Sequence, residues 1–277
     1  MTDYSATFGL SSNLAYLANF EVVPGTGTDP DRQYFASGAL IDAAHFAAFN
    51  YTHDPERLDI GYDGMTMNFA ATDRVAGLTY RLYEKNERKE SLLLTALNLA
   101  AQPRYIAQYT WRSTKPLMLP GGAQKPSYQY RVALLGTPSS SADPLPDFLG
   151  FTGRTAVYGG IPGSQDQSLN DLVTSDQDVF WSYTPSVNHI RGSVALSIVR
   201  DRTQIQIGLL TAEGRFDRPT NTLSGTLTDQ LNGYRGTFRG QVFGPNRAEV
   251  GIVFEFSRDS DGSRYFGHYI GARPQTP

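Results

Sequence analysis

The chain of 277 residues contains no cysteine, which excludes a disulfide framework and any metal site with a thiolate ligand. No run of apolar residues reaches the length of a transmembrane helix. Positive charge is not in excess either, because the 27 aspartates and glutamates outnumber the 24 lysines and arginines, and the formal net charge is -3. Nucleic-acid-binding surfaces need clustered positive charge, so this composition argues against a nucleic-acid partner.

The sequence also lacks the common catalytic motifs. It contains no G-x-S-x-G serine elbow, no G-x-x-x-x-G-K-[ST] phosphate loop and no H-E-x-x-H zinc motif. No charged segment followed by an apolar segment opens the chain as an export signal would, so Met1 is either a cytosolic start or a start placed after a removed signal. We therefore expect a binding protein and not an enzyme.

Residues that favour strands and turns are abundant, with 27 glycines, 16 prolines, 16 tyrosines and 15 phenylalanines. In the second half, apolar and mostly polar residues alternate along several short runs, which is typical of strands with one buried face. One run predicts that Val250, Ile252, Phe254 and Phe256 point into a common core while Glu255 faces solvent. Such strands, joined by short turns, predict an antiparallel sheet that closes into a barrel.

The first half also resembles β-structure, in a less regular form. The stretches "THDPE", "YDG" and "EKNERKE" are interpreted as turns between strands, and "PLMLPGGAQKP" (116–126) as a loop. The one long helix candidate is Ala39–Phe49. The break "TPSSSADPLPD" (137–147) predicts two domains, residues 1–146 and residues 147–277.

The stretch "GTFRGQVFGPNRAEVGIVFEF" (236–256) places a Gly-Pro-Asn turn between two strands. Pro245 fixes its own φ and Asn246 tolerates a left-handed conformation, so the turn predicts a shaped corner between strands with no ligand contact. The stretch resembles the signature of the transferrin-binding-protein-like β-barrel family. The matching residues are Gly240, Phe243, Gly244, Pro245, Asn246, Glu249, Gly251 and Phe254, while Ile252 replaces a glycine that is usual in the family.

Other segments are similar to the same family in family order. "GFTGRTAVYGG" (150–160) resembles the strand that opens the barrel, and "YFGHYIGAR" (265–273) the strand that closes it. "FNYTHDPERLDIGYDGMTMNF" (49–69) and "YIAQYTWR" (105–112) resemble strands of the N-terminal handle domain. The resemblance implies an all-β protein with an N-terminal handle domain of β-sheet and a C-terminal eight-stranded antiparallel β-barrel.

In function, the resemblance implies a bacterial outer-membrane surface lipoprotein or secreted protein that captures a nutrient. Family members work with a TonB-dependent outer-membrane receptor and a dedicated outer-membrane exporter. Some bind transferrin or lactoferrin, and relatives called hemophilins bind haem. The ligand is therefore expected to be haem, the candidate cofactor, or a protein partner; an envelope scaffold is the alternative with no ligand.

Haem iron accepts histidine or tyrosine as an axial ligand. His45 is interpreted either as a partly buried histidine beside Asp42 or as such a ligand, and His53, in the Asp-Pro turn, as an exposed residue or a second ligand. The remaining histidines, His189 and His268, are interpreted as structural. Small barrels fill their interior with side chains, here Phe238, Phe254, Phe256 and Phe266, so we expect the ligand in the handle loops or at the seam between handle and barrel. The candidate contacts are His45, His53, Tyr51, Tyr105 and Tyr109.

Overall fold

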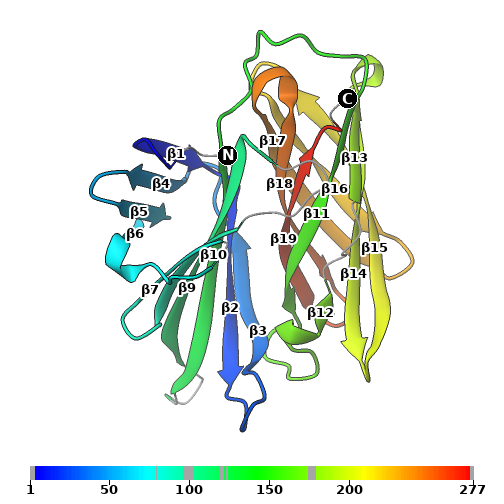
Figure 1. Cartoon of the computed structure of the whole chain (residues 1–277). Helices are drawn as coiled ribbons and strands as arrows, with labels where there is room; N and C mark the ends of the chain where they lie inside the picture. The colour runs from blue at the N-terminus through cyan, green and yellow to red at the C-terminus, as the bar shows by residue number, and fades with distance from the viewer. Residues whose placement is uncertain are drawn as a thin grey trace.

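The computed structural model describes residues 4–78, 80–95, 103–118, 122, 124–173 and 179–274. These residues form an all-β protein in two parts that lie side by side, a handle built from β1 to β10 and a barrel built from β11 to β19 (Figure 1). This architecture confirms the predicted fold class. Within the described ranges, no helix is long and apolar enough to cross a membrane.

The handle consists of two antiparallel sheets. The four-stranded sheet has the order β1 (Phe8–Ser12), β4 (Ala47–Thr52), β5 (Arg57–Tyr62) and β6 (Met65–Ala70). The six-stranded sheet has the order β3 (Arg32–Leu40), β2 (Ala15–Val23), β10 (Gln124–Gly136), β9 (Ile106–Met118), β8 (Glu90–Thr95) and β7 (Arg81–Lys85). One buried cluster joins the two sheets, because it draws Phe49 and Leu58 from the first and Leu92 and Trp111 from the second.

The barrel is a closed antiparallel sheet of eight strands. Pairing of β14 with β15 closes the sheet, and the two-residue strand β12 extends β14 at one edge. Closure by this pairing protects the sheet edges that an open sheet would expose. The strands are β11 (Leu149–Gly160), β12 (Leu172–Val173), β13 (Val179–Thr184), β14 (His189–Arg200), β15 (Thr203–Asp217), β16 (Thr222–Asp229), β17 (Tyr234–Phe243), β18 (Glu249–Arg258) and β19 (Ser263–Ala272).

Side chains fill the barrel interior, as the alternating pattern predicted. Val250, Ile252, Phe254 and Phe256 of β18 all belong to the interior cluster, together with Phe238 of β17. The prediction that Phe266 belongs to this filling is wrong. Its side chain lies on the outer face of β19, where its ring centroid is 6.1 Å from that of Phe35 in the handle. Glu255 also lies on an outward-facing position and is half-buried.

Several predictions for the handle are confirmed and two are wrong. The stretches "THDPE", "YDG" and "EKNERKE" form the turns between β4 and β5, β5 and β6, and β7 and β8. The predicted helix at Ala39–Phe49 does not exist, because β3 continues to Leu40 and β4 begins at Ala47. The predicted loop at 116–126 is a hairpin whose strands extend to Met118 and begin again at Gln124, and residues 119–121 and 123 lie outside the described ranges.

The Gly-Pro-Asn stretch forms the corner between β17 and β18, as predicted. Gly244 has φ +73°, and an added Cβ would meet the ring of Tyr105 at 2.3 Å. Asn246 adopts a left-handed φ of 54° inside the short 3₁₀ turn Pro245–Arg247. Arg247 is buried, and its guanidinium donates to the carbonyl oxygens of Asp143 and Pro144 at 2.6 and 3.0 Å. The corner is therefore fixed both to the handle and to the connection before β11.

Glu249, the first residue of β18, joins the barrel to the handle. Its carboxylate is buried and accepts hydrogen bonds from the backbone N–H groups of Arg104, Tyr105 and Ile106, the last two at 2.9 Å. These N–H groups lead into β9 and would otherwise be buried without an acceptor at the seam. A charged acceptor makes stronger hydrogen bonds than a neutral one, so this contact aligns β9 with the end of the barrel.

We expect Gly244→Ala to destabilise the protein by about 2 kcal/mol more than Gly262→Ala. Both glycines have positive φ (+73° and +70°), but an added Cβ would meet Tyr105 at Gly244 and nothing within 4 Å at Gly262. The pair separates the steric contact from the backbone conformation, which costs alanine alike at both sites. Urea unfolding of the two variants measures the difference, and equal losses would show that the contact with Tyr105 does not constrain the corner.

Replacing the buried carboxylate should be costly. We expect Glu249→Ala to lower the free energy of unfolding by about 3 kcal/mol, because three backbone donors lose a charged acceptor. Glu249→Gln, which keeps one oxygen acceptor, should lose less. The matched control is Glu213→Ala on the exposed outer face of β15, where we expect a change below about 0.5 kcal/mol. Similar losses in Glu249→Ala and Glu213→Ala would contradict this role of Glu249.

Candidate functional site

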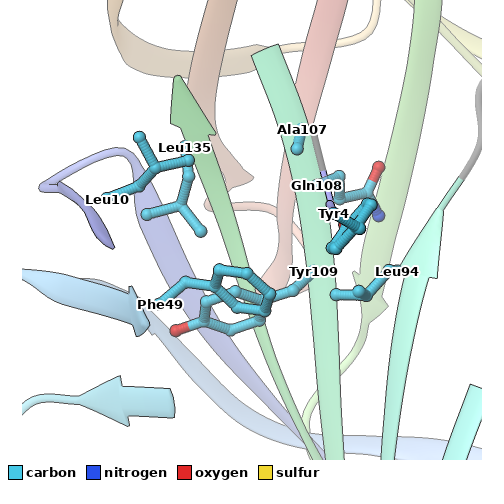
Figure 2. A pocket seen from close by; sticks show the side chains of 8 residues that line it. All are labelled: Tyr4, Leu10, Phe49, Leu94, Ala107, Gln108, Tyr109 and Leu135. Atoms are coloured by element: carbon cyan, nitrogen blue, oxygen red, sulfur yellow. The ribbon is translucent and has the colours of Figure 1, made fainter. Parts of the chain in front are cut away.

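Tyr109 lies at a small hollow between the two handle sheets (Figure 2). Its ring stacks on that of Phe49 with centroids 6.4 Å apart, and its hydroxyl donates to the carbonyl oxygen of Gly61 at 2.8 Å. The space open to the centre of a water molecule is about 10 Å³, enough for one water. The hollow is lined by Tyr4, Leu10, Phe49, Leu94, Ala107, Gln108, Tyr109 and Leu135.

Tyr51 lies in the same buried cluster as Tyr109 and is also part of the packing. Its ring meets that of Tyr4 edge-on, with centroids 5.0 Å apart, and the Arg81 guanidinium lies 3.9 Å from the centroid of the Tyr4 ring.

Burial raises the pKa of Tyr109 far above its usual range. A tyrosine binds iron as the phenolate, so burial opposes the use of Tyr109 as an iron ligand at neutral pH.

Tyr105 lies apart from these two tyrosines, at the seam between handle and barrel. Its half-buried ring covers Gly244 of the corner, and its backbone N–H donates to Glu249. The predicted contact set is therefore divided between the handle interior and the seam. The structure brings Tyr51 and Tyr109 together and places Tyr105 elsewhere.

His45 and His53 flank opposite ends of β4 (Ala47–Thr52), which spans about 20 Å at the usual rise of a strand. They therefore do not converge on one metal ion. Nδ1 of His45 lies 3.4 Å from a carboxylate oxygen of Asp63, and Nδ1 of His53 lies 2.9 Å from the carbonyl oxygen of Tyr4. Both residues are exposed, and each imidazole makes its polar contact through Nδ1.

Metal-ligating side chains do not gather elsewhere in the described part of the chain. No group of three or more histidine, aspartate or glutamate side chains there is arranged to hold a metal ion. The assignment of His45 or His53 as a haem ligand stays a prediction. Because the two histidines lie too far apart to bind the same iron, either one would bind haem without the other.

His268 is the histidine that the seam encloses. It lies on the outer face of β19 beside Phe266 and Ile270, in the cluster where handle and barrel meet. Its Nδ1 is 2.8 Å from the hydroxyl oxygen of Tyr16 on β2, a buried hydrogen bond across the seam. Burial lowers the pKa of His268 to about 3 and raises the pKa of Tyr16, so both side chains are neutral at physiological pH.

Sequence reasoning missed two features of the barrel surface. The first is the pair Phe148 and Phe180, which stack with ring centroids 6.3 Å apart and remain 51% and 50% exposed. Gly150 lies beneath them, since an added Cβ there would meet both rings within 2.8 Å. In the sequence, Gly150 was the residue that could have indicated this pair, because a glycine at an outward position of β11 leaves room for two large rings from different segments.

The second missed feature is a groove of about 210 Å³ on the outer face of β17, β18 and β19. Its lining is mostly polar and comes from three strands that are adjacent in the sheet. The sequence could have indicated this groove through the polar residues at outward positions of the three strands, such as Arg235, Ser257 and Arg264. The lining residues are Arg235, Gly236, Thr237, Glu255, Phe256, Ser257, Arg264 and Phe266.

No protein-family model matches the chain. No curated protein matches it either.

Solved structures do match over most of the chain. Transferrin-binding protein B, isotype 1, from serogroup B Neisseria meningitidis is 13% identical with a TM-score of 0.38; the match covers 98% of this chain and 77% of that one. The N-lobe of lactoferrin-binding protein B of Moraxella bovis is 8% identical with a TM-score of 0.41, over 95% of this chain and 100% of that one. A double mutant of transferrin-binding protein B from Haemophilus parasuis Hp5 is 7% identical with a TM-score of 0.37, over 98% and 76%.

We expect His268 to make folding depend on pH. The histidine is neutral in the fold down to a pKa of about 3 but becomes charged near pH 6.5 in the unfolded chain. Its contribution is therefore complete above pH 6.5 and is lost as the pH falls from 6.5 toward 3. Between pH 7 and pH 5 we expect a loss of about 2 kcal/mol from this residue.

Urea unfolding at pH 7 and pH 5 measures this loss. His268→Gln, which removes the titrating group, should reduce the loss, whereas His45→Gln at an exposed site should leave it unchanged. A wild-type loss that persists in His268→Gln would place the pH dependence in other residues.

Proposed function

We propose that the chain is a non-catalytic binding protein at a bacterial surface and that it captures an iron-carrying protein as a nutrient source. The proposal rests on the resemblance of residues 236–256 to the transferrin-binding-protein-like family, whose members include binders of transferrin and lactoferrin. The corner that this signature predicts is present between β17 and β18, with Gly244 and Glu249 in contact with the handle.

The observation that carries the proposal is the exposed aromatic pair Phe148 and Phe180. The rings are held against Gly150 at the end of the barrel where Glu249 also lies, so they form a fixed apolar surface on a rigid sheet. Large aromatic side chains that are half exposed in the free protein are typical anchors of protein–protein interfaces. This surface therefore suits a protein partner.

The size of the hollows also favours a protein partner over haem. Pockets for small molecules and cofactors usually measure about 300–1,000 Å³. The hollow at Tyr109 has a volume of about 10 Å³ and the groove on the barrel about 210 Å³. Neither is large enough to bury a haem.

The family resemblance supplies the cellular context of the proposal. The chain would be displayed as an outer-membrane surface lipoprotein or released as a secreted protein, after passage through a dedicated outer-membrane exporter. A TonB-dependent outer-membrane receptor would then take the iron or haem from the captured carrier. The family resemblance implies these partners, and co-purification of the receptor and the exporter with the chain from the native membrane tests them.

Haem binding by the handle is the second candidate, and the anchored imidazoles favour it. His45 is held by Asp63 and His53 by the backbone of Tyr4, and an imidazole fixed through Nδ1 presents Nε2 to a metal. Haem would then lie on the handle surface and not in a closed pocket.

Biolayer interferometry on the immobilised chain distinguishes the two. We expect iron-loaded transferrin or lactoferrin to bind, and Phe180→Ala to weaken that binding by about tenfold or more, the loss of one aromatic anchor. The control is Leu231→Ala: Leu231 is 93% exposed but lies in the turn at the opposite end of β17, so it should leave binding unchanged.

The contrary outcomes are equally defined. Absence of binding by both carriers, together with a Soret band on haem titration that His45→Ala or His53→Ala removes, would establish the haem candidate instead. Absence of both kinds of binding would contradict the proposed function and favour an envelope scaffold.

A further inference from the structure

The groove on the barrel surface has an ordered arrangement of charge. In the register of the sheet, Arg235 on β17 pairs with Ser257 on β18, which pairs with Arg264 on β19. The three outward side chains therefore form one row across the strands, with Ser257 between two guanidinium groups. Adjacent strands are about 4.8 Å apart, so both arginine side chains reach the space above the serine hydroxyl.

The next row of the groove carries the opposite charge. Thr237, Glu255 and Phe266 pair across the same strands in this row. Glu255 lies two residues from Ser257 on the same face of β18, a spacing of about 7 Å along the strand. The groove thus has a positive end with two guanidinium groups and a negative centre with one carboxylate.

These charges do not neutralise one another in the structure. Within the described ranges, no carboxylate lies in ion-pair distance of Arg235 or Arg264. Glu255 makes no ion pair there either, and its charged neighbour on the same face is Arg239, which interacts with it through space. The Arg264 guanidinium instead lies 5.5 Å from the centroid of the Phe266 ring, which holds it beside the groove. The charged groups are therefore available to a ligand.

The handle supports one wall of the groove, the Phe266 ring. The Phe266 ring packs against Phe35, with centroids 6.1 Å apart, and it occupies the space beside Gly38 on β3, where an added Cβ would meet it at 2.6 Å. Because this ring is wedged between barrel and handle, the groove has a fixed apolar wall. A fixed wall and a volume of about 210 Å³ match a ligand of roughly amino-acid or dipeptide size.

We propose that this groove binds a small zwitterion whose carboxylate and ammonium are separated by several bonds, such as an ω-amino acid or a dipeptide. The carboxylate lies between Arg235 and Arg264 and accepts a hydrogen bond from Ser257, and the ammonium lies at the Glu255 carboxylate. A ligand with both charges is favoured over a phosphate because Glu255 repels a dianion. It is favoured over a simple amine because the two arginines repel a cation.

This site goes beyond the capture of a carrier protein, since it is a small-molecule site on a different surface. The aromatic pair Phe148 and Phe180 lies at the barrel end that holds the β17–β18 corner. Arg235 lies at the opposite end of β17, near the turn between β16 and β17. Substitutions in the groove should therefore leave binding of a protein at the aromatic pair unchanged.

The probe is 5-aminopentanoate, and its two matched analogues are pentanoate, which lacks the ammonium, and pentylamine, which lacks the carboxylate. Titration of the full ¹⁵N-labelled chain is followed by NMR. We expect saturable shifts of the Thr237, Glu255 and Arg264 amides with 5-aminopentanoate. Each analogue should bind about fivefold or more weakly, the loss of one of two charge contacts. Binding should also weaken in high salt.

Variants assign the two ends of the ligand. Arg264→Gln should weaken binding of 5-aminopentanoate and of pentanoate alike, while Glu255→Gln should remove the preference for 5-aminopentanoate over pentanoate. The matched controls are Arg215→Gln and Glu213→Gln, exposed residues of the same charges on the outer face of β15, and both should bind as the wild type does.

Three results would overturn the proposal. The first is that none of the three probes produces saturable shifts in the groove. The second is that pentanoate or pentylamine binds as tightly as 5-aminopentanoate. The third is that Arg215→Gln and Glu213→Gln weaken binding as much as the groove variants do, which would show nonspecific charge attraction.

Discussion

The buried carboxylate of Glu249 joins the two parts of the molecule. It begins β18 and accepts hydrogen bonds from three backbone N–H groups at the start of β9, so one side chain holds the end of a barrel strand against the start of a handle strand. The close approach of handle and barrel at this contact also explains the glycines beside Glu249. Gly244 must lack a side chain where Tyr105 covers the corner, and at Gly251 an added Cβ would lie 2.4 Å from the terminal methyl of Ile106. Two glycines of the signature, Gly244 and Gly251, thus lie where the handle approaches the barrel, whereas Gly240 leaves room for Leu223 and Ile252 of the barrel itself.

This approach buries both faces of β18 and β19 over the part of the strands near the corner. Phe254 and Phe256 fill the barrel, while Val253 and Ile270 on the opposite face pack against the handle. His268 is enclosed on that second face, and burial away from water lowers its pKa to about 3. A histidine in this position is a neutral member of the packing whose hydrogen bond to Tyr16 joins the two parts.

The sequence predicted what local patterns determine. Alternation identified the interior face of β18, and turn residues located the hairpins and the Gly-Pro-Asn corner. In β15, by contrast, the alternating apolar residues Ile205 and Leu209 are exposed, and Leu210 and Ala212 face the interior. It did not reveal which outward face a second sheet would cover, so Phe266 was assigned to the wrong side of β19. The apolar run at Ala39–Phe49 satisfies a helical pattern locally, but pairing of β3 with β2 and of β4 with β5 decides its structure. The groove and the aromatic pair each join residues distant in sequence, and only strand register brings them together.

The outer face of β17 to β19 is covered by the handle near the corner and open to solvent further along the strands. Near the corner, the handle covers the row of Arg239, Val253 and His268, and the Arg239 guanidinium donates to the carbonyl oxygens of Asn13 and Ile41. Two rows further on, the handle no longer covers the sheet, and the row of Arg235, Ser257 and Arg264 remains open. Packing against the handle therefore accounts for the apolar residues in the covered rows. It gives no reason for two arginines on either side of a serine that make no ion pair within the described ranges. A binding role supplies that reason.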